Sequence, residues 1–133
     1  WRCACAAARP CGTRGEFQAC EGNPGLCPCG KGVAPQGHTP GHSVYGVESK
    51  GQKRVVWGDL MHVAAVQFES PSATMQFDTD SKAAALQRKR AYAEAARQGY
   101  YVGAAHLSFP GIGRLRVQGS GYVFMPVNYS SLP

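Results

Sequence analysis

Three polar residues that lie far apart in the sequence, His42, Asp59 and His106, have side chains that could bind a metal together. His42 follows a Pro-Gly pair and precedes a β-rich stretch, whereas Asp59 and His106 each follow an apolar stretch. In layered α/β proteins, ligands gather where strands end. Imidazole and carboxylate groups are the ligand set of zinc, manganese or iron. We therefore expect a metal site whose ligands come from separate elements of the fold.

Each of these residues also has a simpler interpretation. A histidine on a turn often serves only as a hydrogen-bonding residue, and an aspartate that follows a glycine is a common turn former. The matching positions of the three residues favour the metal interpretation. A zinc-protease helix is excluded for His38 and His42, because its glutamate is absent and Pro40-Gly41 would break the helix. The stretch "GHSVY" lacks the last glycine of a nucleophile elbow.

An α/β fold, layered as α+β, is expected from residue 37 onward to position these side chains. Residues 43–49 and 54–59 predict two strands of a hairpin, the second ending at Asp59. Residues 61–68 predict a buried or semi-buried segment. A strand is expected over 100–106, ending at His106, and two more are expected around the Gly-Ser-Gly turn within 114–127.

One helix is expected over 81–98, with Asp80 or Ser81 as its N-cap and Gly99 at its C-terminal stop. Its apolar arc at 100° per residue faces the sheet, and Lys89 within this arc would have to extend its amine to solvent. The residues of the arc are Ala85, Leu86, Tyr92, Ala93 and Ala96.

Charge and hydropathy exclude two classes of partner. The 133 residues suffice for one domain, and the net charge of +6 is spread along the chain. Its densest run, at 88–90, predicts a solvated helix face rather than a nucleic-acid patch. The apolar runs fall short of the roughly 18 residues of a membrane span. The chain begins with Trp1 rather than methionine, so the sequence predicts no particular localisation.

Residues 1–36 differ in composition from residues 37–133, and we predict a boundary between them. All six cysteines lie in the first segment, where Cys, Ala, Gly, Pro and Arg fill 25 of 36 positions. The segment shows neither a helical nor a strand period and has little apolar surface to offset the entropy of ordering. The cysteine spacing lacks the usual start of a zinc knuckle. A disordered tail, a disulfide or zinc module, and a segment foreign to the rest of the chain remain open.

Three motifs of the second segment, "HTPGHS", "VVWGDLMH" and "GAAHLSFPGIG", resemble the C-terminal half of metallo-β-lactamase-fold hydrolases. They are most similar to the branch that includes methyl parathion hydrolase. The resemblance covers roughly Gly37 to Ser130 and implies one half of an αββα sandwich. It also implies a hydrolase that uses two divalent metals, zinc above all, with manganese, iron or cobalt as alternatives.

The resemblance implies a role for each residue of the predicted site. His42 would be the third histidine on the first metal, Asp59 would bridge both metals and orient the nucleophile, and His106 would complete the second site. His38 would shape the turn, and the role of His62 is open. The family's other four ligands come from a His-x-His-x-Asp-His motif, which this sequence does not contain.

The resemblance therefore implies a fragment of a hydrolase acting on a small-molecule ester, lactone or phosphotriester. The chain alone is expected to be inactive and, with one sheet face uncovered, to self-associate. The alternative function is a non-catalytic zinc-binding or interaction module built on the cysteine-rich segment.

Overall fold

The computed structural model describes residues 25–27, 30–33 and 37–129. Five of the six cysteines lie outside these ranges, and so do the three interpretations of the cysteine-rich segment and the alternative function built on it. The proposed boundary after residue 36 remains a prediction.

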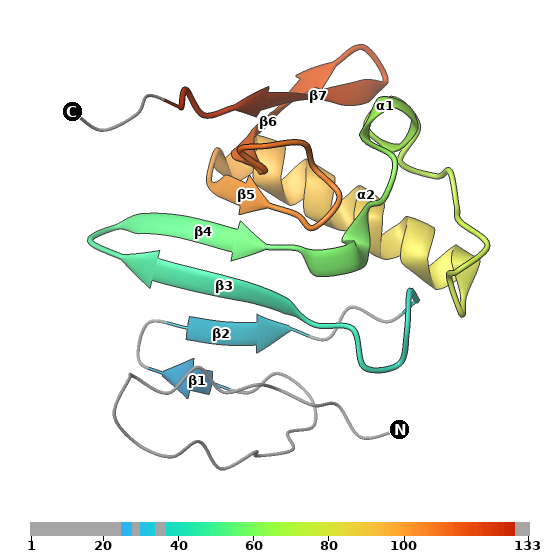
Figure 1. Ribbon diagram of the computed structural model, residues 1–133, viewed down its shortest axis with the longest axis horizontal. Coiled ribbons are helices and arrows are strands. Elements are labelled where there is room, and N and C mark those ends of the chain that lie inside the picture. Colours follow the sequence, from blue (N-terminus) through green and yellow to red (C-terminus); the bar gives the residue numbers. More distant parts are fainter. Residues whose placement is uncertain (1–24, 28–29, 34–36, 130–133) are drawn as a thin grey trace.

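The described residues form one seven-stranded sheet with its strands in sequence order (Figure 1). Only β4 and β5 pair in parallel, and the other neighbours are antiparallel. The predicted α/β fold is confirmed. The strands are β1 (Gly25–Cys27), β2 (Gly30–Val33), β3 (Val44–Ser49), β4 (Gln52–Val56), β5 (Tyr101–Gly103), β6 (Ile112–Gln118) and β7 (Gly121–Pro126).

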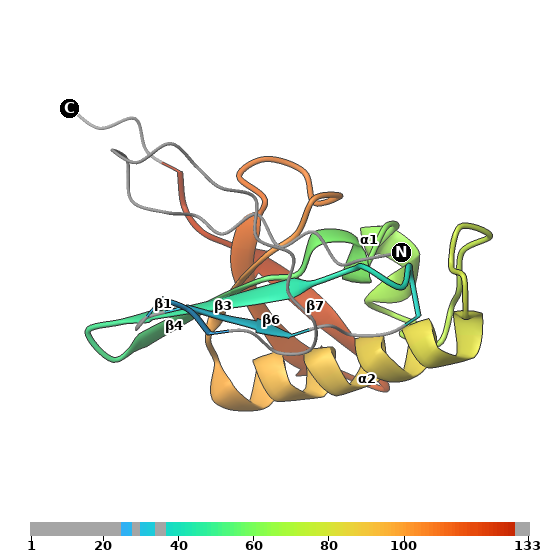
Figure 2. The same ribbon diagram turned by 90° about the horizontal axis from the view of Figure 1, so that it is seen from below.

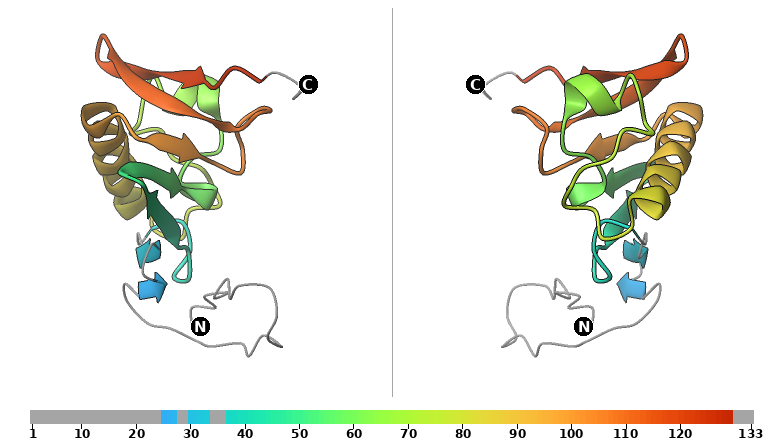
Figure 3. Two further views of the ribbon diagram at one scale, coloured as in Figure 1. Left: turned by 90° about the vertical axis from the view of Figure 1, so that its left-hand side faces the viewer. Right: turned by 90° about the vertical axis from the view of Figure 1, so that its right-hand side faces the viewer.

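Three helical segments accompany the sheet: the 3-10 helix η1 (Gly58–Leu60), the short helix α1 (Ala64–Gln67) and the long helix α2 (Ser81–Gln98). Helix α2 lies along one face of the sheet, as the edge-on views show (Figures 2 and 3). None of the helices in the described part of the chain has both the length and the apolar character that a membrane crossing requires.

The strands β1 and β2 occur where the sequence shows no strand period, which corrects that expectation. β2 pairs with β3 from Gly30↔Val47 to Val33↔Val44. Main-chain hydrogen bonds hold such a ladder together, and they need no alternation of apolar side chains. A strand that contains two glycines therefore escapes a search for hydrophobic period.

The predicted hairpin is confirmed, but its second strand is shorter than expected. β3 and β4 meet at a two-residue turn in which Lys50 and Gly51 both have positive φ, 51° and 72°, as a type I′ turn requires. β4 ends at Val56, and Gly58, with φ +55°, turns the chain into η1. Asp59 therefore lies on a 3-10 turn rather than at a strand end.

The strand before His106 is also shorter than predicted. β5 ends at Gly103, and His106 lies on the loop that leads to β6. The Ala105 N–H donates to the Gly58 carbonyl at 3.3 Å, and the Ala104 N–H donates to the Gly111 carbonyl at 3.3 Å. These bonds take the main chain out of the ladder, so the loop rather than the strand carries His106.

The predicted helix is confirmed over Ser81–Gln98, whereas its predicted buried arc is wrong by about one position. Asp80 caps it by accepting a hydrogen bond from the Ala83 N–H at 2.9 Å, and Gly99 closes it in a left-handed conformation. Leu86 is 48% exposed, and Lys89 is exposed and has no need to extend toward solvent. The buried residues are Ala84, Arg88, Tyr92 and Ala95. One of them is charged, which is why an apolar pattern missed this stripe.

The core lies between α2 and the sheet. Tyr92 of α2 is fully buried and stacks on Trp57 at 5.2 Å between ring centroids, and Phe68 lies 5.2 Å from Tyr92. Val102 and Leu115 complete this cluster from β5 and β6. Burying each such side chain contributes about 1.5–3 kcal/mol. The core thus fixes α2 and the segment after β4, both of which carry or support the polar residues described next.

Candidate metal centre

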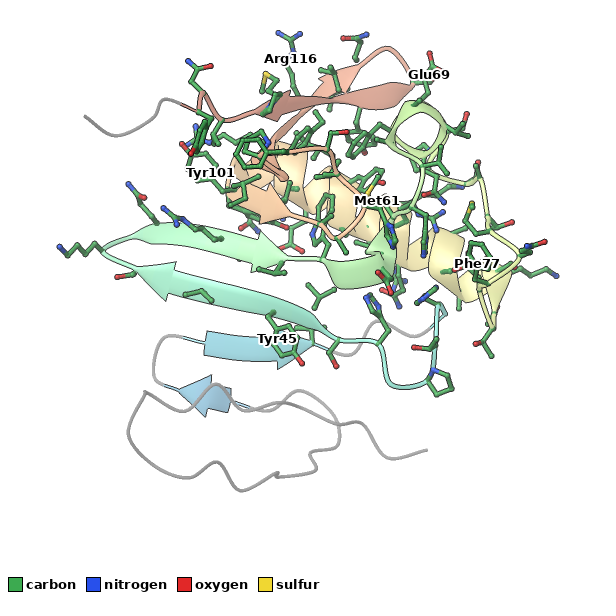
Figure 4. All side chains as sticks on the ribbon, in the orientation of Figure 1. Tyr45, Met61, Glu69, Phe77, Tyr101 and Arg116 are labelled. Atoms are coloured by element: carbon green, nitrogen blue, oxygen red, sulfur yellow. The ribbon has the colours of Figure 1, made fainter. Side chains whose placement is uncertain are left out.

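The four histidines of the sequence converge on Asp59. His38 and His42 come from the turn before β3, Asp59 and His62 come from the segment after β4, and His106 comes from the β5–β6 loop. Met61 and Phe77, labelled in Figure 4, lie at the end of the molecule where these segments meet. The sheet places β3, β4 and β5 side by side, so the segments at their ends reach one another.

His106 and His38 approach different oxygens of the same carboxylate. His106 Nε2 lies 3.0 Å from Asp59 Oδ1, and His38 Nε2 lies 3.5 Å from Asp59 Oδ2. The Asp59 side chain is 42% exposed, so water can reach the carboxylate. These are hydrogen-bond and ion-pair distances, and they place one imidazole nitrogen beside each oxygen of the carboxylate.

His42 faces the main chain of Asp59. The Asp59 N–H donates to His42 Nε2 at 3.0 Å, and the His42 N–H closes the turn onto the Thr39 carbonyl at 3.1 Å. A Cβ at Gly58 would lie 3.0 Å from His42 Nε2, and Gly58 has φ +55°, so this approach favours a glycine. Burial lowers the pKa of His42, and the neighbouring His38 lowers it further.

His62 lies between the other imidazole rings. Its ring stacks on His106 at 4.7 Å and lies 4.8 Å from that of His38. The backbone N–H of His62 donates to Oε1 of the buried Gln67 at 2.7 Å, which fixes the main chain at His62. Burial lowers the pKa of His62, and the neighbouring His38 and His106 lower it further. His62 Nδ1 is buried and has no hydrogen-bond partner among the described residues.

One combination of these residues presents ligand atoms to a common point. One ligand atom from each of His38, Asp59 and His62 lies within 4.8 Å of the others. Two neutral imidazoles and a carboxylate are donors that zinc accepts. The lowered pKa of His62 favours the neutral form that a ligand needs. The donor set therefore fits a divalent cation.

The three residues expected from the sequence, His42, Asp59 and His106, are brought together, since both histidines lie within 3.0 Å of Asp59 atoms. From the family motif His38 is expected only to shape the turn, and the sequence assigns no role to His62. His38 and His42 share one turn, and no spacing signal separates them. The position of Asp59 relative to the turn decides which imidazole meets the carboxylate.

Comparisons with known proteins identify relatives by structure. No protein-family model matches the sequence, and neither does any curated protein. The hydrolase AbOPH of the β-lactamase superfamily matches with TM-score 0.74 and 35% identity, over 79% of this chain and 36% of that chain. AidC, a dizinc quorum-quenching lactonase, matches with TM-score 0.73 and 27% identity, over 77% of this chain and 35% of that chain.

A third relative shows the fold alone. A probable metal-dependent hydrolase from Staphylococcus aureus matches with TM-score 0.65 at 20% identity, over 82% of this chain and 40% of that chain. The chain spans about a third to two fifths of the length of these three structures. The resemblance found in the motifs is therefore confirmed, because the fold of this chain is similar to part of the fold of metallo-β-lactamase superfamily hydrolases.

Proposed function

We propose that this chain carries part of the metal centre of a hydrolase that cleaves small-molecule lactones, esters or phosphotriesters. The observation that carries the proposal is the Asp59 carboxylate with His106 Nε2 at one oxygen and His38 Nε2 at the other. AidC, a dizinc lactonase bound to its product, supports the metal and the lactone part of the substrate class, and AbOPH supports hydrolysis in general. The narrower likeness to methyl parathion hydrolase remains part of this proposal.

Within the proposed centre His42, Asp59 and His106 would serve the two metal positions, with Asp59 between them. Nε2 of His42 lies 3.0 Å from the Asp59 nitrogen, beside the carboxylate. His38 and His62 lie next to these residues, and one ligand atom from each of His38, Asp59 and His62 lies within 4.8 Å of the others.

Two divalent metals held there would lower the pKa of a water to near neutral and would polarise the bond to be cleaved. The residues of this chain would hold that geometry. Asp59 keeps the two positions close together and offers a carboxylate oxygen that can accept a hydrogen bond from the attacking water. The hydrogen bond from the His62 backbone N–H to the buried Gln67 side chain keeps His62 beside Asp59.

The chain by itself should show negligible turnover. It contains four histidines and no His-x-His-x-Asp-His sequence, the motif that the family resemblance calls for. The ligands gathered around Asp59 are too few to fill two metal positions. We expect no hydrolysis of a lactone or a phosphotriester above that of a His42→Ala variant when zinc or manganese is added. Robust metal-dependent turnover lost in that variant would overturn the inactivity.

The metal site is tested by zinc binding, measured by equilibrium dialysis after the cysteine thiols have been alkylated. Alkylation removes any zinc held by the cysteine-rich segment. The expected result is binding that Asp59→Asn and His42→Ala abolish. Asp80→Asn is the matched control, because it makes the same change at an exposed helix cap. Equal binding by Asp59→Asn and wild type would refute the site.

A further inference from the structure

The carboxamide of Gln67 is buried next to the chain segment that carries Asp59. Gln67 ends α1 and is 0% exposed. Its Oε1 accepts hydrogen bonds from the His62 N–H at 2.7 Å and the Val63 N–H at 3.2 Å. Its Nε2 donates to the Ala73 carbonyl at 3.0 Å. One side chain therefore joins the chain that follows Asp59 to the loop between α1 and α2.

The orientation of this amide follows from the chemistry of its partners. The two main-chain N–H groups can only donate and a carbonyl can only accept, so the oxygen faces His62 and Val63 and the nitrogen faces Ala73. A flipped amide would lose all three hydrogen bonds. An apolar side chain of the same length could make none of them, so the main chain after Asp59 depends on an amide at this position.

A second buried side chain holds the same two segments. Arg88 of α2 is 1% exposed, and its Nε donates to the Leu60 carbonyl at 2.9 Å. Its Nη1 donates to the Ala73 carbonyl, which therefore accepts hydrogen bonds from both Gln67 and Arg88. Leu60 directly follows Asp59 in the sequence. Buried side chains thus hold the main chain within 60–63 at several points, and they tie it to one carbonyl of the loop.

Asp59 needs these anchors because its own turn does not fix its conformation. Its φ of −95° and ψ of 26° depart from helical values inside η1. The chain before it is tied to β5, since the Trp57 N–H donates to the Gly103 carbonyl at 2.7 Å. The Asp59 side chain is 42% exposed, so packing contributes little to its position. The anchors on the other side of Asp59, within 60–63, therefore decide where the carboxylate points.

We propose that Gln67 is a positioning residue of the candidate metal centre, which holds the chain after Asp59 against the α1–α2 loop and thereby fixes the carboxylate beside His106. This inference rests on the proposed function for the metal itself. Gln67 acts through the main chain and contacts neither metal nor substrate. Removing a residue that orients a metal ligand lowers metal affinity about 10–100-fold. A residue that only starts helix α1 would instead change stability alone.

The first test uses the full chain without metal. Amide hydrogen exchange followed by NMR should show slow exchange of the His62 and Val63 N–H groups. A nuclear Overhauser effect should join the rings of His62 and His106, whose centroids lie 4.7 Å apart. Gln67→Met, which keeps the length of the side chain and removes its hydrogen bonds, should lose this ring contact. Fast exchange of both amides in the wild type would overturn the proposal, even if Gln67→Met fails to fold.

Zinc affinity of the thiol-alkylated chain, measured by equilibrium dialysis, supplies the second test. Gln67→Met should lower the affinity at least about tenfold. Leu115→Ala is the stability control, because it weakens the core on β6 away from this segment. At a temperature where all variants are folded, it should bind zinc like the wild type. Gln118→Met makes the same change as Gln67→Met at the exposed end of β6, and it should alter neither measurement.

The outcomes separate positioning from stability and from the metal site. Equal losses of zinc affinity in Gln67→Met and Leu115→Ala would reduce Gln67 to a structural residue and overturn the proposal. A folded Gln67→Met variant with the wild-type ring contact and affinity would overturn it as well. If the wild type binds no zinc but Gln67→Met loses the ring contact, the positioning stands and the metal site fails.

Discussion

The two faces of the sheet differ in what covers them. On the face that packs against α2, Val55, Val102 and Leu115 are at most 8% exposed. On the opposite face, four apolar side chains are 39–49% exposed: Val47, Val56, Ile112 and Met125. The strand register places these four on one side, because Val47 pairs with Arg54 and Met125 pairs with Arg114.

The uncovered face mixes apolar side chains with cations. The Arg114 guanidinium lies 4.3 Å from the ring centroid of Tyr101, and that of Arg54 lies 5.9 Å from it. Tyr101, Tyr45 and Arg116 are labelled in Figure 4. Strands that are apolar on both sides are typical of sheets covered on both faces. Helix α2 therefore covers one face only, and we predict that the second face mediates self-association of this chain.

The same substitution on the two faces should give the largest contrast. Tyr92→Ala empties a fully buried position between Trp57 and Phe68, and should lower the free energy of unfolding by about 3–5 kcal/mol. Tyr101→Ala on the uncovered face should cost less than about 1 kcal/mol. Urea unfolding followed by circular dichroism measures both. Similar losses for the two variants would show that the second face is also packed.

The second largest effect is expected from alkaline pH, which should lower the free energy of unfolding through the buried tyrosines Tyr92 and Tyr100. Burial raises the pKa of Tyr100 to about 12, with Glu94 adding to the effect, and burial also raises the pKa of Tyr92. An unfolded tyrosine ionises near pH 10. Above that pH the unfolded chain loses these protons while the folded chain keeps them, so the stability present below about pH 10 is lost toward about pH 12.

The urea midpoint, compared between about pH 9 and about pH 11.5, checks this alkaline loss. Tyr100→Phe should reduce the difference between the two midpoints, because it removes the hydroxyl that the fold keeps protonated. Tyr129→Phe is the matched control, since Tyr129 is 70% exposed. A midpoint independent of pH in the wild type would contradict the prediction.

Self-association through the uncovered face should respond to a single charge. Monomers rarely expose large contiguous apolar patches, so the exposed apolar side chains of this face lead us to expect that the chain self-associates and binds a hydrophobic dye. Val56→Lys should weaken association at least about tenfold, or about 1.4 kcal/mol. Val66→Lys is the matched control, because Val56 and Val66 are both 49% exposed but Val66 lies on α1. Sedimentation velocity measures the effect.

The wild type itself can disprove the association. A monodisperse monomer with a sharp melting transition and no dye binding would show that the second face is covered within this chain. Equal weakening by Val56→Lys and Val66→Lys would place the contact elsewhere.

The smallest effect concerns one hydroxyl on the covered face. The Tyr92 hydroxyl is buried without a hydrogen-bond partner among the described residues. A buried polar group left unpaired costs free energy, so Tyr92→Phe should leave the stability unchanged or raise it by up to about 1 kcal/mol. Thermal melts compared with Tyr101→Phe measure this. A clear loss of stability in Tyr92→Phe would point to a partner for the hydroxyl, such as a buried water.

Local signals in the sequence determined the long helix α2 and the turn between β3 and β4. Asp80 and Gly99 set the ends of α2, and Lys50-Gly51 set the β3–β4 turn, because capping and positive φ depend on neighbouring residues only. The convergence of His42, Asp59 and His106 was also predictable. Shared placement next to strands and resemblance to family motifs were sufficient for it.

Tertiary packing decided which charged and polar groups are buried and which imidazole faces the carboxylate. Arg88 belongs to a basic run that predicted a solvated face, yet it is 1% exposed, because four polar partners replace its water: the carbonyls of Leu60, Pro71 and Ala73 and the carboxylate of Asp78. His38 and His42 share a turn, and only the path of the chain through Gly58 aims Asp59 at the first and its N–H at the second. The contact between His42 and Asp59 joins residues 17 positions apart, and that between Arg88 and Leu60 joins residues 28 positions apart. No local sequence pattern records contacts over such separations.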